Sequence, residues 1–263
     1  MEFFDTAQGR RSSILAKLRE DANVSVSDLS NEFGVSEVTI RKDLRILEGR
    51  NLLVRVHGGA MRSSNPSGPA FEESHYDTKA LVHELEKQAI GKAAAKHIQE
   101  GDTILIDAGT TALEVVRNLD AFQNLTIITN SLSAISELKR YNRFNVIMLG
   151  GNVRETSQSL VGPIAESNLR VFFCDKLFLG VDSFSVEDGL SPPSIEEAHT
   201  NQVMISRAKE VIAVFDSSKV NERAFAYIAS VDKINTIVTD SNFPASVRAK
   251  LKAMNVAVEI AEI

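Results

Sequence analysis

The chain has 263 residues, of which 43% are hydrophobic, enough to bury a core in one large domain or in a small domain and a larger one. No apolar stretch approaches the roughly 20 residues that span a bilayer, and Met1 to Arg11 lacks the apolar centre of a signal peptide, so we expect a cytoplasmic protein without a membrane partner. The net charge of −6 excludes a uniformly basic nucleic-acid binder, and the single cysteine, Cys174, excludes an intramolecular disulfide.

Three short helices are predicted near the N-terminus. Residues 10–20 carry apolar side chains at helical spacing. A second helix covers residues 27–33, and Gly34 after it permits a tight exit from the helix. A third helix begins at Ser36, so the segment has the order helix, turn, helix that DNA-binding domains use.

The third helix has one apolar and one basic face. Ser36 can cap it by accepting a hydrogen bond from the backbone N–H of Thr39, and Glu37 suits the positive end of the helix dipole. The apolar stripe is Ile40, Leu44 and Leu47, and the opposite face carries Val38, Arg41, Lys42 and Arg45. Such a helix by itself is more often a solvated surface helix, but the preceding helix and turn favour a major-groove reader.

The segment after this helix predicts a β-hairpin. Residues 52–56 alternate as in a strand, and His57-Gly58-Gly59-Ala60 can turn the chain back. Residues 41–62 hold six Lys and Arg against two acidic residues, whereas residues 63–263 have a net charge of −7. Positive charge is therefore concentrated on the reading helix and the hairpin, where it would meet the DNA backbone.

These residues resemble the N-terminal signature of the DeoR family of bacterial transcriptional regulators, and the hairpin resembles the wing of that family. The residues that match in type and spacing are Arg10, Ile14, Leu18, Ser36, Thr39, Ile40, Arg41, Lys42, Asp43 and Leu44. The resemblance implies a winged helix-turn-helix that binds double-stranded operator DNA.

We expect Arg41 and Lys42 to contact bases directly, with Val38 against a thymine methyl group. Basic side chains beyond them are expected to contact phosphates. The full predicted DNA-binding set is Ser36, Glu37, Val38, Thr39, Arg41, Lys42, Arg45, Arg50, Arg55 and His57.

A linker rich in Pro, Gly and Ser follows at residues 61–70. We therefore predict a DNA-binding domain at 1–62, a linker at 63–75 and an effector domain at 76–263. After an amphipathic helix over 81–98, short apolar strands alternate with helices, which predicts an α/β domain with a mostly parallel sheet. The expected strands are 103–107, 125–129, 144–149, 176–181, 210–215, 236–239 and 256–261.

Ligands of parallel sheets bind at the carboxyl ends of strands, and several strand-end loops here are polar. Asp107-Ala108-Gly109-Thr110-Thr111 offers hydroxyls and free N–H groups for a phosphate, although the same residues can simply turn the chain and cap a helix. The next two strand ends add polar or flexible residues, namely Thr129, Asn130 and Ser131, then Gly150, Gly151 and Arg154. Three such loops in succession favour a pocket. Arg154 could pair with an anionic ligand there, although an arginine on a loop is by default only a surface charge.

The later segments resemble the DeoR-type effector domain, which is related in fold to ribose-5-phosphate isomerase and glucosamine-6-phosphate deaminase. That resemblance implies a phosphorylated sugar as ligand, with a phosphate loop formed by Asp107, Gly109, Thr110 and Thr111. It also implies that Asp182, Glu197 and Lys219 are former catalytic positions that bind sugar hydroxyls and phosphate.

The alternative is an isomerase-like enzyme with an attached DNA-binding module, which requires a positioned base and an electrophilic partner. Leu179 stands where the first of two isomerase aspartates is expected, and residues 186–190 lack the lysine. We therefore predict a repressor of a carbohydrate catabolic operon, released by a phosphorylated sugar, and not an enzyme. Since one helix reads few base pairs, we expect a homodimer or homotetramer. The spacing of the five histidines predicts no metal site, and no cofactor is expected.

One departure from the family pattern concerns signalling. Family members commonly carry Phe-x-x-Arg after the linker, whereas this chain has Phe71-Glu72-Glu73-Ser74. The sequence therefore leaves open how ligand binding reaches the DNA-binding domain.

Overall fold

The computed structural model describes residues 7–21, 23–48, 53–56, 58–62 and 75–263. Contacts divide the chain into two compact units, one formed by Met1–Ala70 with Asp77–Glu84 and the other by Phe71–Tyr76 with Leu85–Ile263. The predicted DNA contacts Arg50 and His57, and the Phe71 to Ser74 departure, lie outside the described residues. No described helix is long and apolar enough to cross a membrane.

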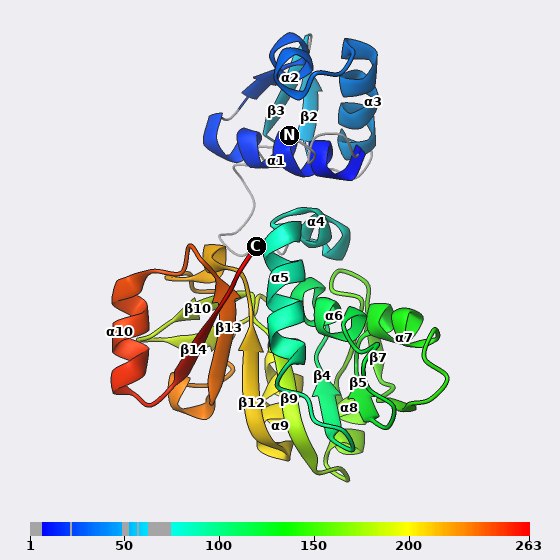
Figure 1. Ribbon diagram of the computed structural model, residues 1–263, viewed down its shortest axis with the longest axis vertical. Coiled ribbons are helices and arrows are strands. Elements are labelled where there is room, and N and C mark those ends of the chain that lie inside the picture. The colour runs from blue at the N-terminus through cyan, green and yellow to red at the C-terminus, as the bar shows by residue number, and fades with distance from the viewer. Residues whose placement is uncertain (1–6, 22, 49–52, 57, 63–74) are drawn as a thin grey trace. The chain divides into compact units, whose positions relative to one another are not determined.

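The N-terminal unit is a winged helix-turn-helix (Figure 1). Its helices are α1 (Ala7–Asp21), α2 (Val26–Phe33) and α3 (Glu37–Glu48), and its strands are β1 (Asn23–Ser25), β2 (Leu53–Val56) and β3 (Gly59–Arg62). Gly34 ends α2 with φ +65°, which confirms the predicted turn. The hairpin of β2 and β3 is confirmed as well, and β1 adds an unpredicted third strand by pairing antiparallel with β3. The core consists of buried side chains from all three helices, β2, β3 and Leu81.

The helix predicted over residues 81–98 corresponds to α5 (Glu84–Ala95), which begins three residues later and ends three residues earlier than expected. A separate short helix, α4 (Tyr76–Leu81), precedes it. Between them His83 adopts φ +53°, a left-handed conformation that interrupts helical hydrogen bonding. Leu81 is 4% exposed and packs in the core of the winged helix-turn-helix, so most of α4 belongs to the N-terminal unit, although the sequence placed it in the effector domain.

The C-terminal unit is built on a seven-stranded sheet with the order β14-β13-β12-β9-β4-β5-β6, and every pairing in it is parallel. Each predicted strand is present, with ends shifted by a few residues, because strands buried on both faces are short apolar runs. Their bounds are β4 Thr103–Ile106, β5 Thr126–Thr129, β6 Asn145–Met148, β9 Cys174–Gly180, β12 Ala208–Val214, β13 Thr236–Asp240 and β14 Ala257–Ala261.

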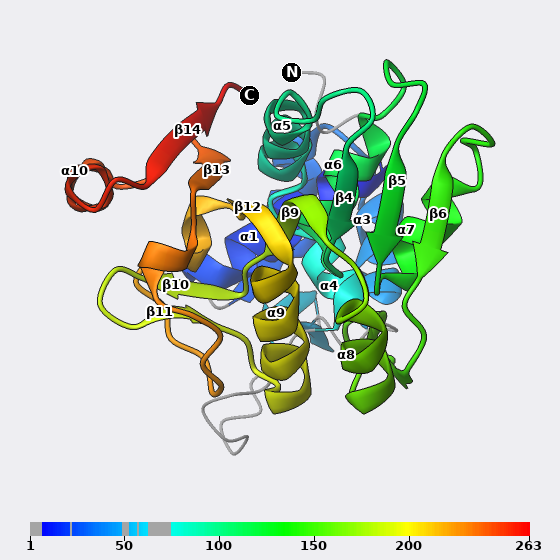
Figure 2. The same ribbon diagram turned by 90° about the horizontal axis from the view of Figure 1, so that it is seen from below.

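Helices cover both faces of this sheet. Ile104 and Ile106 of β4 face the cluster formed with α5 and two further helices, whereas Leu105 between them faces the opposite cluster. Figure 2 shows α5 and α6 on one side of the strands and α8 and α9 on the other. The remaining helices are α6 Thr110–Arg117, α7 Leu132–Leu138, α8 Pro163–Leu169, α9 Ile195–Arg207 and α10 Ala245–Ala253.

Two short antiparallel hairpins accompany the sheet. One pairs β7 (Asn152–Arg154) with β8 (Ser159–Val161), and the other pairs β10 (Ser183–Ser185) with β11 (Gly189–Ser191). Cys174 lies buried at the start of β9, and burial, with the charge of Asp175, raises the pKa of its thiol to about 11. The thiol is therefore a small apolar group of the core.

The strand order creates a switch point in the middle of the sheet. The chain runs outward from β4 through β5 to β6, then returns to place β9 beside β4 and runs outward the other way. A crevice forms at such a point outside the carboxyl ends of the strands. The polar loops after β4, β5, β9 and β12 all lie at this edge of the sheet, because the strands are parallel.

Candidate functional site

Helix α3 presents its basic face to solvent. Ser36 Oγ accepts from the N–H of Thr39 at 3.3 Å, which confirms the predicted cap. Ile40, Leu44 and Leu47 are buried, and Val38 opposite them is 73% exposed. The exposed side chains of Arg41, Lys42 and Arg45 flank Val38 on the predicted reading face.

Two of the predicted DNA contacts have acidic neighbours within the unit. Arg41 Nη2 lies 2.7 Å from Glu37 Oε2, one helical turn earlier, and Arg55 Nη1 lies 3.4 Å from Glu48 Oε2. Both pairs are solvent-exposed and therefore weak, so a phosphate or a guanine edge can replace the carboxylate. Ser36 and Thr39 instead hydrogen-bond to each other through their hydroxyls at 3.0 Å, which gives them a capping role.

Helix α3 is anchored by an acidic residue on its inner face. Asp43 is 2% exposed, and its carboxylate accepts from Arg10 Nε at 3.0 Å and from Arg11 Nε at 2.8 Å. Sequence reasoning had matched Arg10 and Asp43 to a family signature without assigning them a contact. These ion pairs fix α3 against α1 and so hold the reading face in place.

Asp107 is the central polar group of the C-terminal unit. It follows β4, and its backbone N–H donates to the carbonyl of Phe178 on β9 at 3.0 Å, directly at the switch point. Burial raises the pKa of its carboxyl well above the usual value, and the charges of Glu197 and Asp182 raise it further. The three predicted acidic residues are therefore brought together by the fold.

Glycines line the crevice next to Asp107. A β-carbon at Gly180 would make ordinary contacts with the carbonyl of Ala108 at 3.4 Å and with Asp107 Oδ2 at 3.5 Å, so Gly180 adjoins the Asp107 carboxyl. Gly109 has φ +153° and starts α6, and no described side chain caps that helix. Its first N–H groups, with Thr110 and Thr111 in the first turn, remain able to bind an anion.

In the loop after β5, some side chains stabilise the fold and one faces the candidate site. Thr129 Oγ donates to the carbonyl of Ile106 at 2.7 Å and accepts from the N–H of Ser131, and Ser131 Oγ caps α7 through Ala134 at 3.1 Å. Both predicted residues therefore have structural roles. Asn130 differs: its Nδ2 donates to Asp107 at 3.5 Å, while its buried Oδ1 has no partner among the described residues.

Arg154 and Glu197 complete this cluster. Arg154 Nη1 lies 3.3 Å from Glu197 Oε1, which also receives Ser159 Oγ at 3.5 Å. Ser157 lies 3.2 Å from Arg154 and 2.8 Å from Ser159. The two serines belong to the hairpin of β7 and β8 and were absent from the predicted set. The one feature of the sequence that could have indicated them is their polar character next to the apolar residues of a short strand.

Other predicted effector residues have different positions. Gly150 and Gly151 have positive φ, and a β-carbon at Gly151 would lie 2.7 Å from the carbonyl of Val161, so this turn serves the packing of the hairpin. Lys219 lies in the turn Ser217–Lys219 after β12, and none of the contacts that the structure describes joins it to Asp107 or Glu197. That turn is instead held by Asp240, which accepts from the N–H of Ser217 at 2.6 Å.

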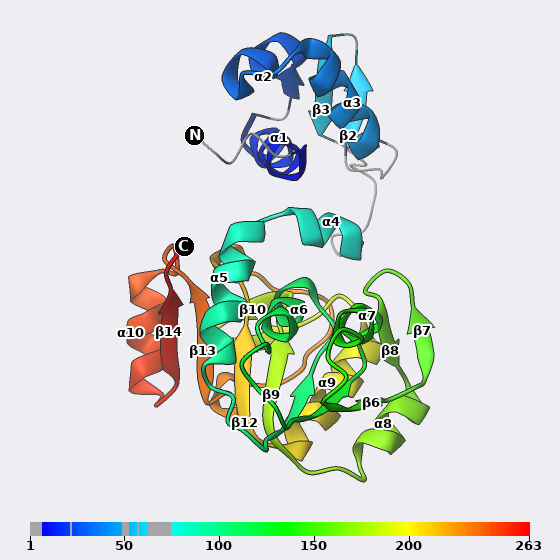
Figure 3. The same cartoon turned by 45° about the vertical axis from the view of Figure 1, so that its right-hand side comes forward.

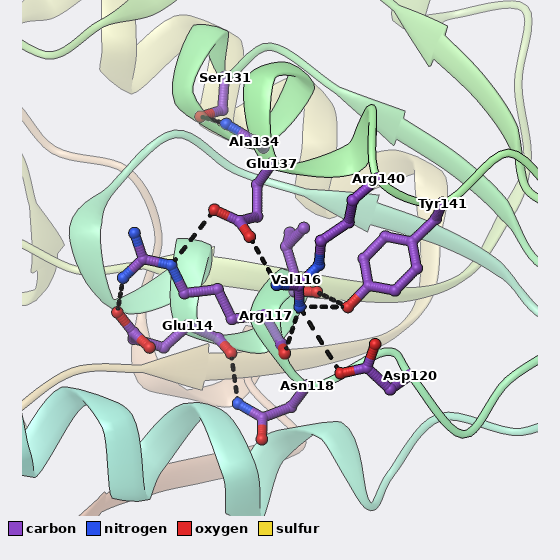
Figure 4. Close-up of polar contacts among 10 residues, drawn as sticks. All are labelled: Glu114, Val116, Arg117, Asn118, Asp120, Ser131, Ala134, Glu137, Arg140 and Tyr141. Carbon is purple, nitrogen blue, oxygen red and sulfur yellow. Dashed lines mark hydrogen bonds and ion pairs between the residues drawn. The ribbon is translucent and has the colours of Figure 1, made fainter.

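A surface ion-pair network fixes the two helices that begin at the crevice. Glu114 of α6 pairs with Arg117 at 2.6 Å, and Arg117 contacts Glu137 of α7 at 3.5 Å. Glu137 also holds Arg140 at 2.9 Å, and Arg140 donates to the carbonyl of Arg117 at 2.9 Å (Figure 4). This network joins α6 to α7.

Comparison with known proteins agrees with both units. The family described as DeoR-like helix-turn-helix domain matches residues 10–65, and the DeoR C terminal sensor domain matches residues 82–241. The chain is 36% identical to the transcriptional repressor AccR of Agrobacterium fabrum, over 90% of this chain and 91% of that protein. It is 35% identical to the HTH-type transcriptional regulator GlpR of Haloferax volcanii, over 95% of this chain and 96% of that protein.

The chain belongs to the DeoR family of transcriptional repressors. As a DeoR-type repressor it binds DNA through its winged helix-turn-helix, and the α/β unit that holds Asp107 and Glu197 is its sensor domain. Among solved structures, ribose 5-phosphate isomerase A of Methanocaldococcus jannaschii overlaps 52% of this chain and 55% of its own, with 18% identity and a TM-score of 0.39. Similarity at that level bears on neither the ligand nor a reaction.

Proposed function

We propose that this DeoR-type repressor holds the operator of a carbohydrate catabolic operon and releases it when a phosphorylated sugar binds at the β4–β9 crevice. The observation that carries the proposal is the grouping of Asp107, Asn130, Asp182, Arg154 and Glu197 beside the uncapped start of α6. Helix N-termini bind phosphates, and carboxylates with a buried amide oxygen accept hydrogen bonds from hydroxyl groups. Such a site suits a ligand with a phosphate at one end and hydroxyls along its length.

The electrostatics favour a polyhydroxyl ligand over a purely anionic one. Burial and the charges of Glu197 and Asp182 hold the pKa of the Asp107 carboxyl high, and a further anion placed against this acidic group would add to the same like-charge repulsion. A phosphate at Gly109 and Thr110 is bound by backbone N–H groups instead, which leaves the acidic side of the crevice to sugar hydroxyls. Arg154, which is paired with Glu197 at 3.3 Å, adds a positive charge to this acidic side of the crevice.

At the DNA, two copies of α3 are proposed to read repeated half-sites, because one helix contacts only a few base pairs. The repressor is therefore proposed to act as a homodimer or homotetramer. A thousandfold loss of operator affinity on induction requires about 4 kcal/mol of differential binding between the two states.

The test uses operator DNA selected by the full-length protein from a randomised duplex library. Operator binding is followed by fluorescence anisotropy with ribose 5-phosphate, glucose 6-phosphate, fructose 1-phosphate, fructose 6-phosphate and glucosamine 6-phosphate, each compared with its unphosphorylated sugar. Release by a phosphosugar and not by its sugar supports the proposal. Turnover of any of these phosphosugars would instead identify an enzyme, and absence of binding to the whole panel would count against a phosphosugar sensor.

A further inference from the structure

The hairpin of β7 and β8 connects the crevice to the start of α4. Arg154 closes one strand of the hairpin and lies in register with Ser159 on the other. Both side chains contact Glu197 Oε1, at 3.3 Å and 3.5 Å. Glu197 belongs to α9, so the conformation of the hairpin is set by a contact inside the proposed effector site.

The second strand of the hairpin is fixed to the sheet. The N–H of Leu160 donates to the carbonyl of Asn130 at 2.8 Å, and the N–H of Leu132 donates to the carbonyl of Gln158 at 3.0 Å. Figure 3 shows β7 and β8 beside α7. The strand that carries Ser159 is therefore held by backbone hydrogen bonds at the start of α7, whereas β7 contacts that region through its pairing with β8, and its Val153 is 60% exposed.

The turn of the hairpin holds the first residue of α4. The carbonyl of Thr156, two residues after Arg154, accepts from the backbone N–H of Tyr76 at 2.7 Å. Tyr76 is the first residue of α4 and belongs to the C-terminal unit, whereas Asp77–Glu84 belong to the N-terminal unit. Within that unit Leu81 packs in the core of the winged helix-turn-helix, so one short helix is held at its two ends by different units.

The far end of α4 is suited to act as a hinge. His83 has φ +53°, a left-handed conformation that non-glycine residues rarely adopt. The conformation separates α4 from α5, so α4 can change direction without moving the sheet helices.

We propose that the hairpin transmits effector binding to the DNA-binding unit: a ligand that separates Arg154 from Glu197 moves the turn, and the Tyr76–Thr156 hydrogen bond carries that movement into α4. This inference rests on the proposed function for the identity of the ligand. It supplies a route that does not depend on the Phe-x-x-Arg arginine, which this chain lacks at Ser74.

The transmission can be tested without any ligand. Arg154→Met removes the contact with Glu197 while keeping an unbranched, flexible side chain, and Arg248→Met on the exposed surface of α10 is the matched control. Operator affinity of the full-length protein is measured by anisotropy on library-selected DNA. We expect a loss of fivefold or more with Arg154→Met and less than twofold with Arg248→Met.

The hydrogen bond is then removed by Tyr76→Pro. Proline has no N–H but is tolerated in the first turn of a helix, and Tyr76→Ala is the matched control because it loses the ring and keeps the N–H. Arg154→Met is expected to weaken operator binding in the Tyr76→Ala background but not in the Tyr76→Pro background. An equal loss in both backgrounds, or no loss from Arg154→Met alone, overturns the proposal.

Amide hydrogen exchange over residues 76–81 keeps the proposal testable if Tyr76→Pro does not fold. Faster exchange in Arg154→Met than in the wild type and Arg248→Met supports it, and unchanged exchange contradicts it. Neither experiment contains a sugar phosphate, so its outcome is independent of whether the phosphosugar panel binds.

Discussion

Arg10 and Asp43 form an ion pair, with 3.0 Å between Nε and Oδ2, that joins the first helix to the reading helix through the interior of the DNA-binding unit. Arg11 contacts the other carboxylate oxygen at 2.8 Å. Such a pair stabilises the fold modestly when intact, but loss of one member leaves the other charge buried without compensation.

Asp43→Asn should therefore destabilise the winged helix-turn-helix by about 3 kcal/mol. The measurement is urea unfolding of the full chain by far-UV circular dichroism, with the transition of the N-terminal unit fitted separately. Glu32→Gln is the matched control, because its pair with Lys17 at 2.9 Å is solvent-exposed and should contribute less than about 1 kcal/mol. Equal effects of the two substitutions would show that Asp43 does not anchor α3.

Replacement of Arg41 by alanine should reduce discrimination between operator and scrambled DNA by about 1–3 kcal/mol, because a bidentate base contact is lost. Arg45→Ala should instead weaken binding to both DNAs alike and lower the slope of affinity against salt concentration. Both affinities are measured by anisotropy at salt concentrations from about 50 to about 200 mM, because the release of counterions from DNA makes affinity fall steeply over this range. An equal loss on both DNAs with Arg41→Ala would make Arg41 a phosphate contact.

Asp182→Ala should leave operator binding intact and abolish release by the inducing phosphosugar, because Asp182 lies beside Asp107 at the crevice. The readout is operator affinity with and without the phosphosugar that releases the wild type. Asp188→Ala serves as the control, since that exposed aspartate sits on the far hairpin with Arg223 at 3.7 Å. Unchanged release in Asp182→Ala would place the pocket elsewhere.

The stability of the sensor domain should fall as pH rises, through Asp107. Burial raises its folded-state pKa above the ordinary value of 3.8, so between those two pKa values the folded state binds more protons than the unfolded state. The free energy of unfolding therefore decreases with pH across that window and stays lower above it.

Asp107→Asn mimics the protonated carboxyl and should remove this dependence. Compared with the wild type, the variant should become more stable as the pH is raised above the ordinary pKa of an aspartate, because the wild-type carboxyl must then ionise in a buried position. Thermal unfolding at each pH gives the difference, with Asp188→Asn as an exposed control. A difference between variant and wild type that does not change with pH would rule out a raised pKa at Asp107.

Elements with a strong local signal were predictable from the sequence. The seven buried strands are continuous apolar runs, and the helix-turn-helix is marked by Ser36, Gly34 and a regular apolar stripe. The break at His83 was missed because the apolar pattern continues through it, while the left-handed φ depends on tertiary packing. The separate roles of Thr129, Asn130 and Ser131 were not predictable for a related reason. A threonine or serine that caps a helix cannot be distinguished by residue type from one that faces a ligand.

The site itself was only partly predictable. Strand-end positions identified Asp107 and Arg154, because parallel strands bring their carboxyl ends together, whereas Glu197 of α9 was expected only from the resemblance to the DeoR-type effector domain. Ser157 and Ser159 could not be singled out, since their contacts depend on a hairpin register that the sequence does not specify. The pairing of Asp43 with two arginines likewise needs the fold, because the partners lie more than thirty residues apart.

The Arg154–Glu197 pair has a consequence for how a cell would set its response. Coupling between two binding events is reciprocal, so if separation of this pair weakens the hold on DNA, a bound operator must by the same factor disfavour the sugar phosphate. A repressor seated on a strong operator would then require more metabolite for release than the same repressor on a weak one. Promoters controlled by this protein would therefore be released one after another as the sugar phosphate accumulates, in the order of increasing affinity of their operators for the repressor.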